Sequence, residues 1–238
     1  MALSDGIGHA ETAPATARTP DTASFTRFYR LVRVIVHAIN RLFFRTTVEG
    51  AELVPTEGPL ILAPVHRSFI DFWVASEAVR DRKLHYMTKD TLWKNRFLAK
   101  LIPKLGGFPV NRDAPDREAL RLAQSVLEAG EVLVLFPEGT RRSGPIVEDL
   151  HEGVAFLAAR TGAPIVPLGI GGSASVMPKG TLLPRPHHIH LVVGEPIVAP
   201  AASTSGRVPR SAVHATTEQL RATVQELYDR SVAVTGRY

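Results

Sequence analysis

The sequence predicts an α/β layered domain with a mixed, largely parallel sheet flanked by helices, preceded by an N-terminal amphipathic helix. Short apolar runs of strand length alternate with longer segments whose apolar residues recur every three or four positions. Glycine and proline stand at the borders of these segments, where helices and strands commonly end. The 238 residues, 45% of them hydrophobic, suffice for one domain with a substantial core.

Residues 1–24 contain mainly Ala, Thr, Pro and small polar residues, without apolar periodicity. This composition predicts a disordered tail, because too little apolar surface is present to form a core. No positively charged segment precedes an apolar stretch there, so we do not expect a secretory signal peptide.

Residues 25–45 have the pattern of a basic amphipathic helix, with apolar and basic side chains on separate faces. The longest run without a charge is far shorter than the roughly 20 residues of a membrane span. One interpretation is an interfacial helix on an anionic membrane, and the other is a helix that packs on the core with a solvated basic face. The apolar positions are Phe28, Leu31, Val32, Ile35, Ile39, Leu42 and Phe43, and the basic ones are Arg27, Arg30, Arg33, His37 and Arg41. The many arginines favour the membrane surface.

Residues 46–238 are expected to form the domain itself. We expect strands over residues 59–65, 83–88, 131–136 and 165–170, and helices over residues 91–104, 114–130, 152–161 and 216–232. The segment HHIHLVVG predicts one more strand, in which His188 and His190 share a face. Since no acidic or cysteine ligand is near, a strand end is favoured over a metal site. Gly169, Gly171 and Ala174 spell G-x-G-x-x-A, a possible dinucleotide-binding fingerprint, which we reject because Pro178 stops the helix that such a site requires.

The amino-acid composition excludes cysteine chemistry and favours anionic partners. Without cysteine the chain has no disulfide, no cysteine-ligated zinc and no cysteine nucleophile. A formal net charge of +5 favours anionic partners, which include nucleic acid, phosphorylated substrates and anionic membrane surfaces.

The most informative stretch is VHRSFID, which follows the apolar 59–65 strand. We expect His66 at the strand end and a helix that begins near Phe69, with Ser68 as its N-cap and Asp71 in its first turn. On one continuous helix His66 and Asp71 would lie about 140° apart. If the chain folds back, the carboxylate reaches the imidazole, as in a general base held by an acid. The alternative is a strand-end histidine beside an aspartate that only interacts with the helix dipole.

Two later stretches carry groups suited to phosphate. GGFPVNR places Arg112 after a short extended segment, and a guanidinium binds phosphate through two hydrogen bonds. FPEGTRRSG follows the 131–136 strand with a glycine that permits close approach of a polar substrate. Its functional candidates are Glu138, Gly139, Thr140 and Arg141, whereas Arg142 is expected to belong to a polar turn.

The stretches VHRSFID, GGFPVNR and FPEGTRRSG are followed by IVPLGI at residues 165–170. In their order and spacing, these four stretches resemble those of the glycerolipid acyltransferases. The resemblance implies transfer of a fatty acyl group from acyl-CoA or acyl carrier protein to a hydroxyl of 1-acyl-glycerol-3-phosphate, giving phosphatidic acid. His66 would act as general base and Asp71 would orient it. The acceptor would be held by Arg112, Glu138, Gly139, Thr140 and Arg141. Neither a metal nor an organic cofactor is implied.

The resemblance also implies an enzyme of phospholipid biosynthesis that binds peripherally to anionic lipids on the cytoplasmic face of the cell membrane. The acceptor remains open, because glycerol 3-phosphate, another lysophospholipid or a glycolipid would present the same hydroxyl chemistry. A nucleic-acid-binding protein would explain the charge, but no helix-turn-helix or aromatic RNA-binding signature is present. A serine hydrolase through Ser68 would need a G-x-S-x-G elbow, which the sequence lacks.

Overall fold

The computed structural model describes residues 26–79, 81–110, 117–178, 181, 183–202 and 207–236. The predicted tail at residues 1–24, Arg112 and the first residues of the predicted 114–130 helix lie outside these ranges.

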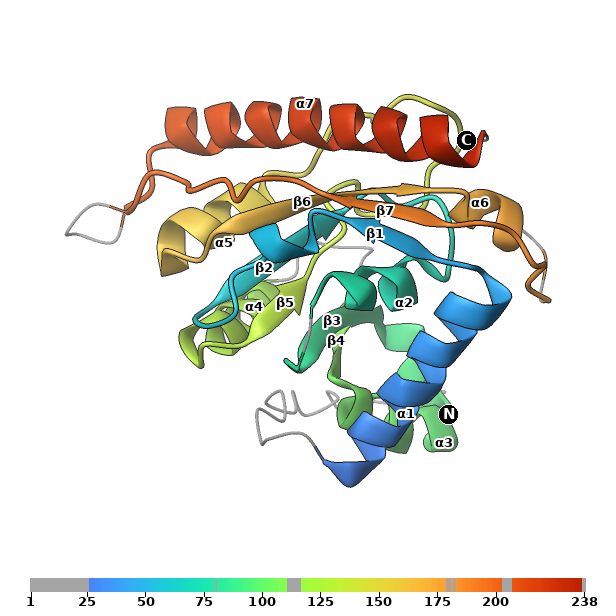
Figure 1. Ribbon diagram of the computed structural model, residues 1–238. Coiled ribbons are helices and arrows are strands. Elements are labelled where there is room, and N and C mark those ends of the chain that lie inside the picture. The colour runs from blue at the N-terminus through green and yellow to red at the C-terminus, as the bar shows by residue number, and fades with distance from the viewer. Residues whose placement is uncertain are drawn as a thin grey trace, which may run out of the picture.

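A seven-stranded sheet organises the described part of the chain, in the order β1-β7-β6-β2-β5-β3-β4 (Figure 1). All neighbouring strands are parallel except β6 and β7, which are antiparallel. The predicted mixed, largely parallel sheet is therefore confirmed. The strands are β1 (Thr47–Glu49), β2 (Leu60–Pro64), β3 (Leu84–Lys89), β4 (Gly107–Val110), β5 (Val132–Val134), β6 (Ile165–Gly171) and β7 (His190–Val193).

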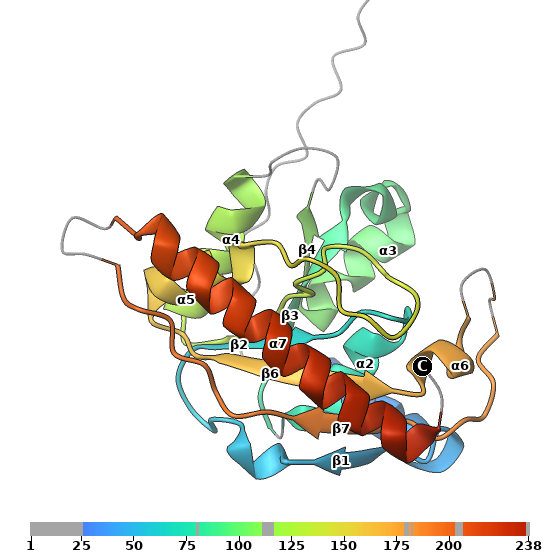
Figure 2. The same ribbon diagram turned by 90° about the horizontal axis from the view of Figure 1, so that it is seen from above.

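The helices flank this sheet, with α7 on one side of β6 and β7 and α2 on the other (Figure 1). Figure 2 shows α7 crossing in front of both strands. The α-helices are α1 (Arg27–Ala38), α2 (Asp71–Ala75), α3 (Arg96–Leu101), α4 (Arg117–Glu128), α5 (Gly153–Thr161), α6 (Ser173–Val176) and α7 (Arg210–Thr235). Short π or 3₁₀ turns are η1 (Ile39–Phe43), η2 (Ala51–Leu53), η3 (Ser76–Ala78), η4 (Asp90–Lys94) and η5 (Pro103–Leu105).

The central strands form the core. Every residue of β2, β5 and β6 is buried, as expected for parallel strands that are covered on both faces. Gly169 and Gly171 of β6 let α7 approach closely, because a Cβ on either would lie within 2.4 Å of the α7 backbone. These two glycines of the G-x-G pattern therefore serve helix packing.

Three local expectations were wrong. The predicted 91–104 helix is divided into η4, α3 and η5, because the Asn95 side chain accepts hydrogen bonds from the Phe97 and Leu98 amides and begins a new helix. Ser68 is not an N-cap, since α2 begins at Asp71 and the Ser68 hydroxyl donates to the Met177 carbonyl. The last helix begins at Arg210, six residues before the start of the predicted 216–232 helix.

Candidate active site

The candidate site lies where two neighbouring parallel strands end. β2 pairs with β5, so the residues that follow each strand emerge at the same edge of the sheet. His66 follows β2, and the segment that begins at Phe136 follows β5. In open α/β sheets, ligands bind outside the carboxyl ends of the strands. The topology thus brings two of the sequence-predicted motifs together.

The His66 imidazole and the Asp71 carboxylate form a hydrogen bond across the turn between β2 and α2. The distance between His66 Nδ1 and Asp71 Oδ2 is 3.0 Å. The same oxygen accepts hydrogen bonds from the Arg67 and Ser68 amides, both at 2.6 Å. Asp71 is completely buried. The carboxylate therefore shapes the turn that folds the chain back and also holds the imidazole.

Phe136 packs against one face of the imidazole. The rings of His66 and Phe136 are stacked, with their centroids 3.9 Å apart and their planes inclined by 26°. His66 as a residue is only 8% exposed. Because the Asp71 carboxylate accepts a hydrogen bond from Nδ1–H, the neutral imidazole has its acceptor nitrogen at Nε2. The ring is thus held in one orientation and in the tautomer that a general base requires.

Glu138 is buried beneath His66. Its side chain is fully buried, and its carboxylate accepts a hydrogen bond from the His66 amide at 2.9 Å. The Arg67 guanidinium donates to both Glu138 oxygens, at 2.8 and 2.7 Å. The family resemblance implies that Glu138 contacts the acceptor, and in the structure its carboxylate lies at the backbone amide of His66.

The remaining residues of the motif lie nearer the surface. Gly139 has a φ of +68°, and a Cβ there would lie 2.6 Å from the imidazole of His151. Thr140 and Arg141 are exposed, whereas the Arg142 side chain forms an ion pair with Glu148 at 3.1 Å. Arg141 is therefore better placed than Arg142 to meet a ligand.

Two predicted features lie elsewhere. Arg112 is outside the described residues, two positions after β4 ends at Val110. His188 and His190 both contact the Thr47 hydroxyl, at 2.9 and 2.7 Å. Within the described ranges, no group of three or more His, Cys, Asp or Glu is arranged to hold a metal.

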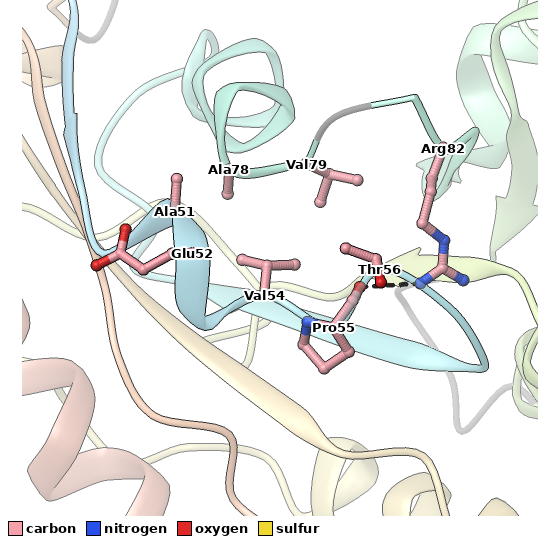
Figure 3. A pocket seen from close by; sticks show the side chains of 8 residues that line it. All are labelled: Ala51, Glu52, Val54, Pro55, Thr56, Ala78, Val79 and Arg82. Atoms are coloured by element: carbon pink, nitrogen blue, oxygen red, sulfur yellow. Dashed lines mark hydrogen bonds between the residues drawn. The ribbon is translucent and has the colours of Figure 1, made fainter.

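A groove of about 260 Å³ lies beside η2 (Figure 3). Arg82 lines this groove, and its guanidinium donates hydrogen bonds to the carbonyls of Pro55, Gly58 and Gly130. Gly58 and Gly130 precede β2 and β5, so these contacts tie the loops at the amino ends of the strands. The groove lies at the opposite ends of β2 and β5 from His66 and is not part of the candidate site.

Comparison with known proteins identifies the family. A family model described as Acyltransferase matches residues 45–171, more than half of the chain. The chain belongs to the acyltransferase family. The matched region of this acyltransferase contains His66, Asp71 and the whole 136–142 segment.

The relatives narrow the family to glycerolipid acyltransferases. The chain is 27% identical over 183 residues to a 1-acyl-sn-glycerol-3-phosphate acyltransferase of Bacillus subtilis, covering 77% of this chain and 88% of that one. A Streptococcus pneumoniae protein of the same name is 29% identical, and the match covers 74% of this chain and 64% of that protein. A chloroplastic relative from Arabidopsis thaliana is 24% identical, but this chain spans only 44% of its length.

A solved structure shares the fold. The crystal structure of the 1-acyl-sn-glycerophosphate acyltransferase PlsC from Thermotoga maritima superposes with a TM-score of 0.66 and 26% identity, covering 84% of this chain and 79% of that one. The α/β architecture and the O-acyltransferase class predicted from the sequence are thereby confirmed.

Proposed function

We propose that this acyltransferase moves a fatty acyl group from an acyl thioester to the free hydroxyl of 1-acyl-glycerol-3-phosphate, giving phosphatidic acid. The observation that carries the proposal is the hydrogen bond of 3.0 Å between His66 and buried Asp71 at the carboxyl end of β2. The names of the bacterial relatives support this acceptor.

The mechanism follows from the orientation of His66. Nε2 of His66 takes the proton of the acceptor hydroxyl while the hydroxyl oxygen attacks the thioester carbonyl. Asp71 stabilises the imidazolium that forms. The tetrahedral intermediate then collapses, the C–S bond breaks, and the imidazolium returns the proton to the leaving thiolate. The donor, acyl-CoA or acyl carrier protein, is a substrate, and no step needs a metal or an organic cofactor.

Acceptor binding is assigned to the residues at the open side of the motif. Arg141 is exposed at the carboxyl end of β5, and together with Arg112 it would bind the acceptor phosphate. Gly139 and Thr140 shape the turn against which the acceptor would lie. Glycerol 3-phosphate, another lysophospholipid or a glycolipid offers the same hydroxyl, so the acceptor is decided by assay.

We also propose that the enzyme binds peripherally to anionic lipids on the cytoplasmic face of the cell membrane through α1 and η1. Apolar side chains stay exposed along this segment beside its arginines, as on interfacial helices. Among the described residues no helix is both long and apolar enough to span a membrane. The exposed apolar residues are Phe28, Leu31, Val34, Ile35, Ile39, Leu42 and Phe43.

The test of the activity is thiol release from palmitoyl-CoA by the purified protein with lysophosphatidic acid, with glycerol 3-phosphate or with no acceptor, alongside His66→Ala. Release that requires lysophosphatidic acid and disappears in His66→Ala is the expected result. Release that needs no acceptor would indicate a thioesterase. If palmitoyl-CoA is inert, the same assay with palmitoyl-acyl carrier protein tests the other donor, and inactivity with both would overturn the proposal.

A further inference from the structure

Arg67, the residue after His66, is almost completely enclosed. Its side chain is 2% exposed, and its guanidinium lies over the ring of Tyr228 in α7, 4.9 Å from the ring centroid. Besides Glu138, it donates to the carbonyls of Gly144 and Ile146, at 3.2 and 3.0 Å. One guanidinium thus ties the loop after β2 to the loop after β5.

The backbone of His66 is held on both sides by these groups. Its amide donates to Glu138, and its carbonyl accepts hydrogen bonds from the Arg142 amide at 3.0 Å and from Arg67 Nη1 at 3.2 Å. Phe136, Glu138 and Arg142 all belong to the segment after β5. The position of His66 therefore depends on that segment, and the Arg67–Glu138 pair joins the two.

We propose that Arg67 and Glu138 are positioning residues that hold His66 in place for proton transfer, a role that rests on the proposed function of His66 as the general base. Glu138 does this through the His66 amide, and Arg67 does it by fixing the Glu138 carboxylate and the His66 carbonyl. This assignment replaces the acceptor-binding role that the family resemblance implied for Glu138.

The chemistry of the pair favours this role. A fully buried carboxylate that already accepts hydrogen bonds from Arg67 and His66 has little capacity left for an acceptor, and its negative charge would repel a phosphate. Arginine is required at position 67 because its planar fork reaches four acceptor groups in different directions, which a lysine ammonium cannot do. Proton transfer depends on the position of the His66 imidazole, since a displacement of a catalytic group by about 1 Å can lower the rate about 100-fold.

The kinetic test compares Arg67→Met, Glu138→Gln and the double variant with the wild type. Removing one partner of a buried ion pair strands the other charge, whereas removing both is often tolerated, so the double variant should melt at a higher temperature than either single variant. We expect its kcat to be about 100-fold lower, with the acceptor KM within about twofold of the wild type. Arg221→Met, which breaks the exposed Arg221–Glu218 pair on α7, is the matched control and should leave kcat unchanged.

A spectroscopic test is independent of turnover. In protein labelled at histidine, the ring resonance of His66 is identified by its loss in His66→Ala. In the double variant this resonance should move or split, and in Arg221→Met it should stay in place. If the methionine variants do not fold, Arg67→Lys, which keeps the charge and loses the fork, should still displace it.

Two results would overturn the proposal. Wild-type kcat and an unmoved His66 resonance in a folded double variant would limit the pair to stability. A raised acceptor KM with unchanged kcat in Glu138→Gln would return Glu138 to acceptor binding. If the wild type is inactive with every donor and acceptor that is assayed, the proposed function fails, yet the His66 resonance still decides whether the pair positions the imidazole.

Discussion

The imidazole of His66 and the phenyl ring of Phe136 are stacked, although 70 positions separate them in the sequence, and their centroids lie 3.9 Å apart. Asp71 restrains the imidazole only at Nδ1, so the hydrogen bond alone leaves the ring free to tilt about that contact. Phe136 removes this freedom from one face. The catalytic geometry that we propose therefore depends on the strand pairing of β2 with β5.

Phe136→Leu should lower kcat about 10-fold without changing the KM for either substrate. The stacked pair contributes about 0.5–1.5 kcal/mol beyond simple burial, and a loss of 1.4 kcal/mol in the transition state is about 10-fold. Steady-state thiol release measures both constants. Phe108→Leu, which removes a buried ring from β4, controls for general loss of packing. An equal fall in kcat in both variants would contradict a specific role for the stack.

Asp71→Asn should lower kcat about 1,000-fold or more. The amide can still accept hydrogen bonds from the Arg67 and Ser68 amides, so the turn is expected to fold, but it lacks the charge that stabilises the imidazolium. Single-turnover thiol release and the melting temperature are the measurements. Asp90→Asn, at an exposed aspartate in η4, is the control. Near-wild-type kcat in Asp71→Asn would remove the general-base assignment.

The fold was predictable wherever the local pattern and the tertiary packing agree. The apolar run before His66 becomes β2 because a central parallel strand is buried on both faces. Thr47–Glu49 forms β1 at the sheet edge, where only Val48 is even partly buried and the apolar signal is absent. The helix expected over residues 91–104 failed at Asn95, whose side chain competes for backbone amides.

The candidate site was predictable only in its local part. His66 and Asp71 are five residues apart, so one turn brings them together and the sequence could indicate their contact. Arg67 and Glu138 are 71 residues apart, and their pairing requires β2 and β5 to be neighbours. The sequence shows only that Arg67 and Glu138 carry opposite charges and that each follows a predicted buried strand. Strand order, which local patterns do not determine, was the missing information.

Gly139→Ala should destabilise the protein more than Gly130→Ala does. Both glycines have similar positive φ angles, +68° and +78°, and an alanine there costs about 1–2 kcal/mol in either case. A Cβ at Gly139 also meets the His151 ring at 2.6 Å, whereas a Cβ at Gly130 has no neighbour within 4 Å. Thermal unfolding measures the difference, and we also expect a raised acceptor KM for Gly139→Ala alone.

Adding His151→Ala to Gly139→Ala separates the two contributions. The double variant should recover the part of the stability that the contact with His151 removes and keep the part that the backbone angle removes. Equal melting temperatures for Gly139→Ala and Gly130→Ala would show that the His151 ring simply moves aside.

His188 should make the protein less stable in mild acid. Burial, together with the positive charges of His190, Arg45 and His187, lowers the pKa of His188 below its usual 6.5. Between the lowered pKa and about 6.5 the unfolded chain binds more protons than the folded one, so stability falls as the pH falls through this window.

His188→Gln removes this titration and offers Thr47 another hydrogen-bonding group. We expect the melting temperature to fall less between pH 7 and pH 5 in this variant than in the wild type. His214→Gln, on the exposed face of α7, provides the comparison. An undiminished fall in His188→Gln would contradict the assignment.

Substitution of the exposed apolar side chains of α1 should weaken binding to anionic vesicles. Leu31 and Val34 are 58% and 65% exposed, so replacing both with glutamine leaves the protein core intact. Transfer of each side chain into the acyl region contributes about 1.5 kcal/mol or more, which predicts roughly 10-fold weaker binding for each substitution. Co-sedimentation with phosphatidylglycerol vesicles measures the change.

Point substitutions test α1 better than deletion of residues 1–45 does. Deletion would also remove Tyr29, Asn40 and Phe44, which are buried, and with them the hydrogen bonds from the Leu84 amide to Tyr29 and from Asn40 to Glu77. Because Glu77 lies just after α2, the deletion would disturb the element that carries Asp71. Val234→Gln, at a side chain of α7 that is 53% exposed, is the matched control. Unchanged vesicle binding by the doubly substituted α1 would exclude this helix as the membrane contact.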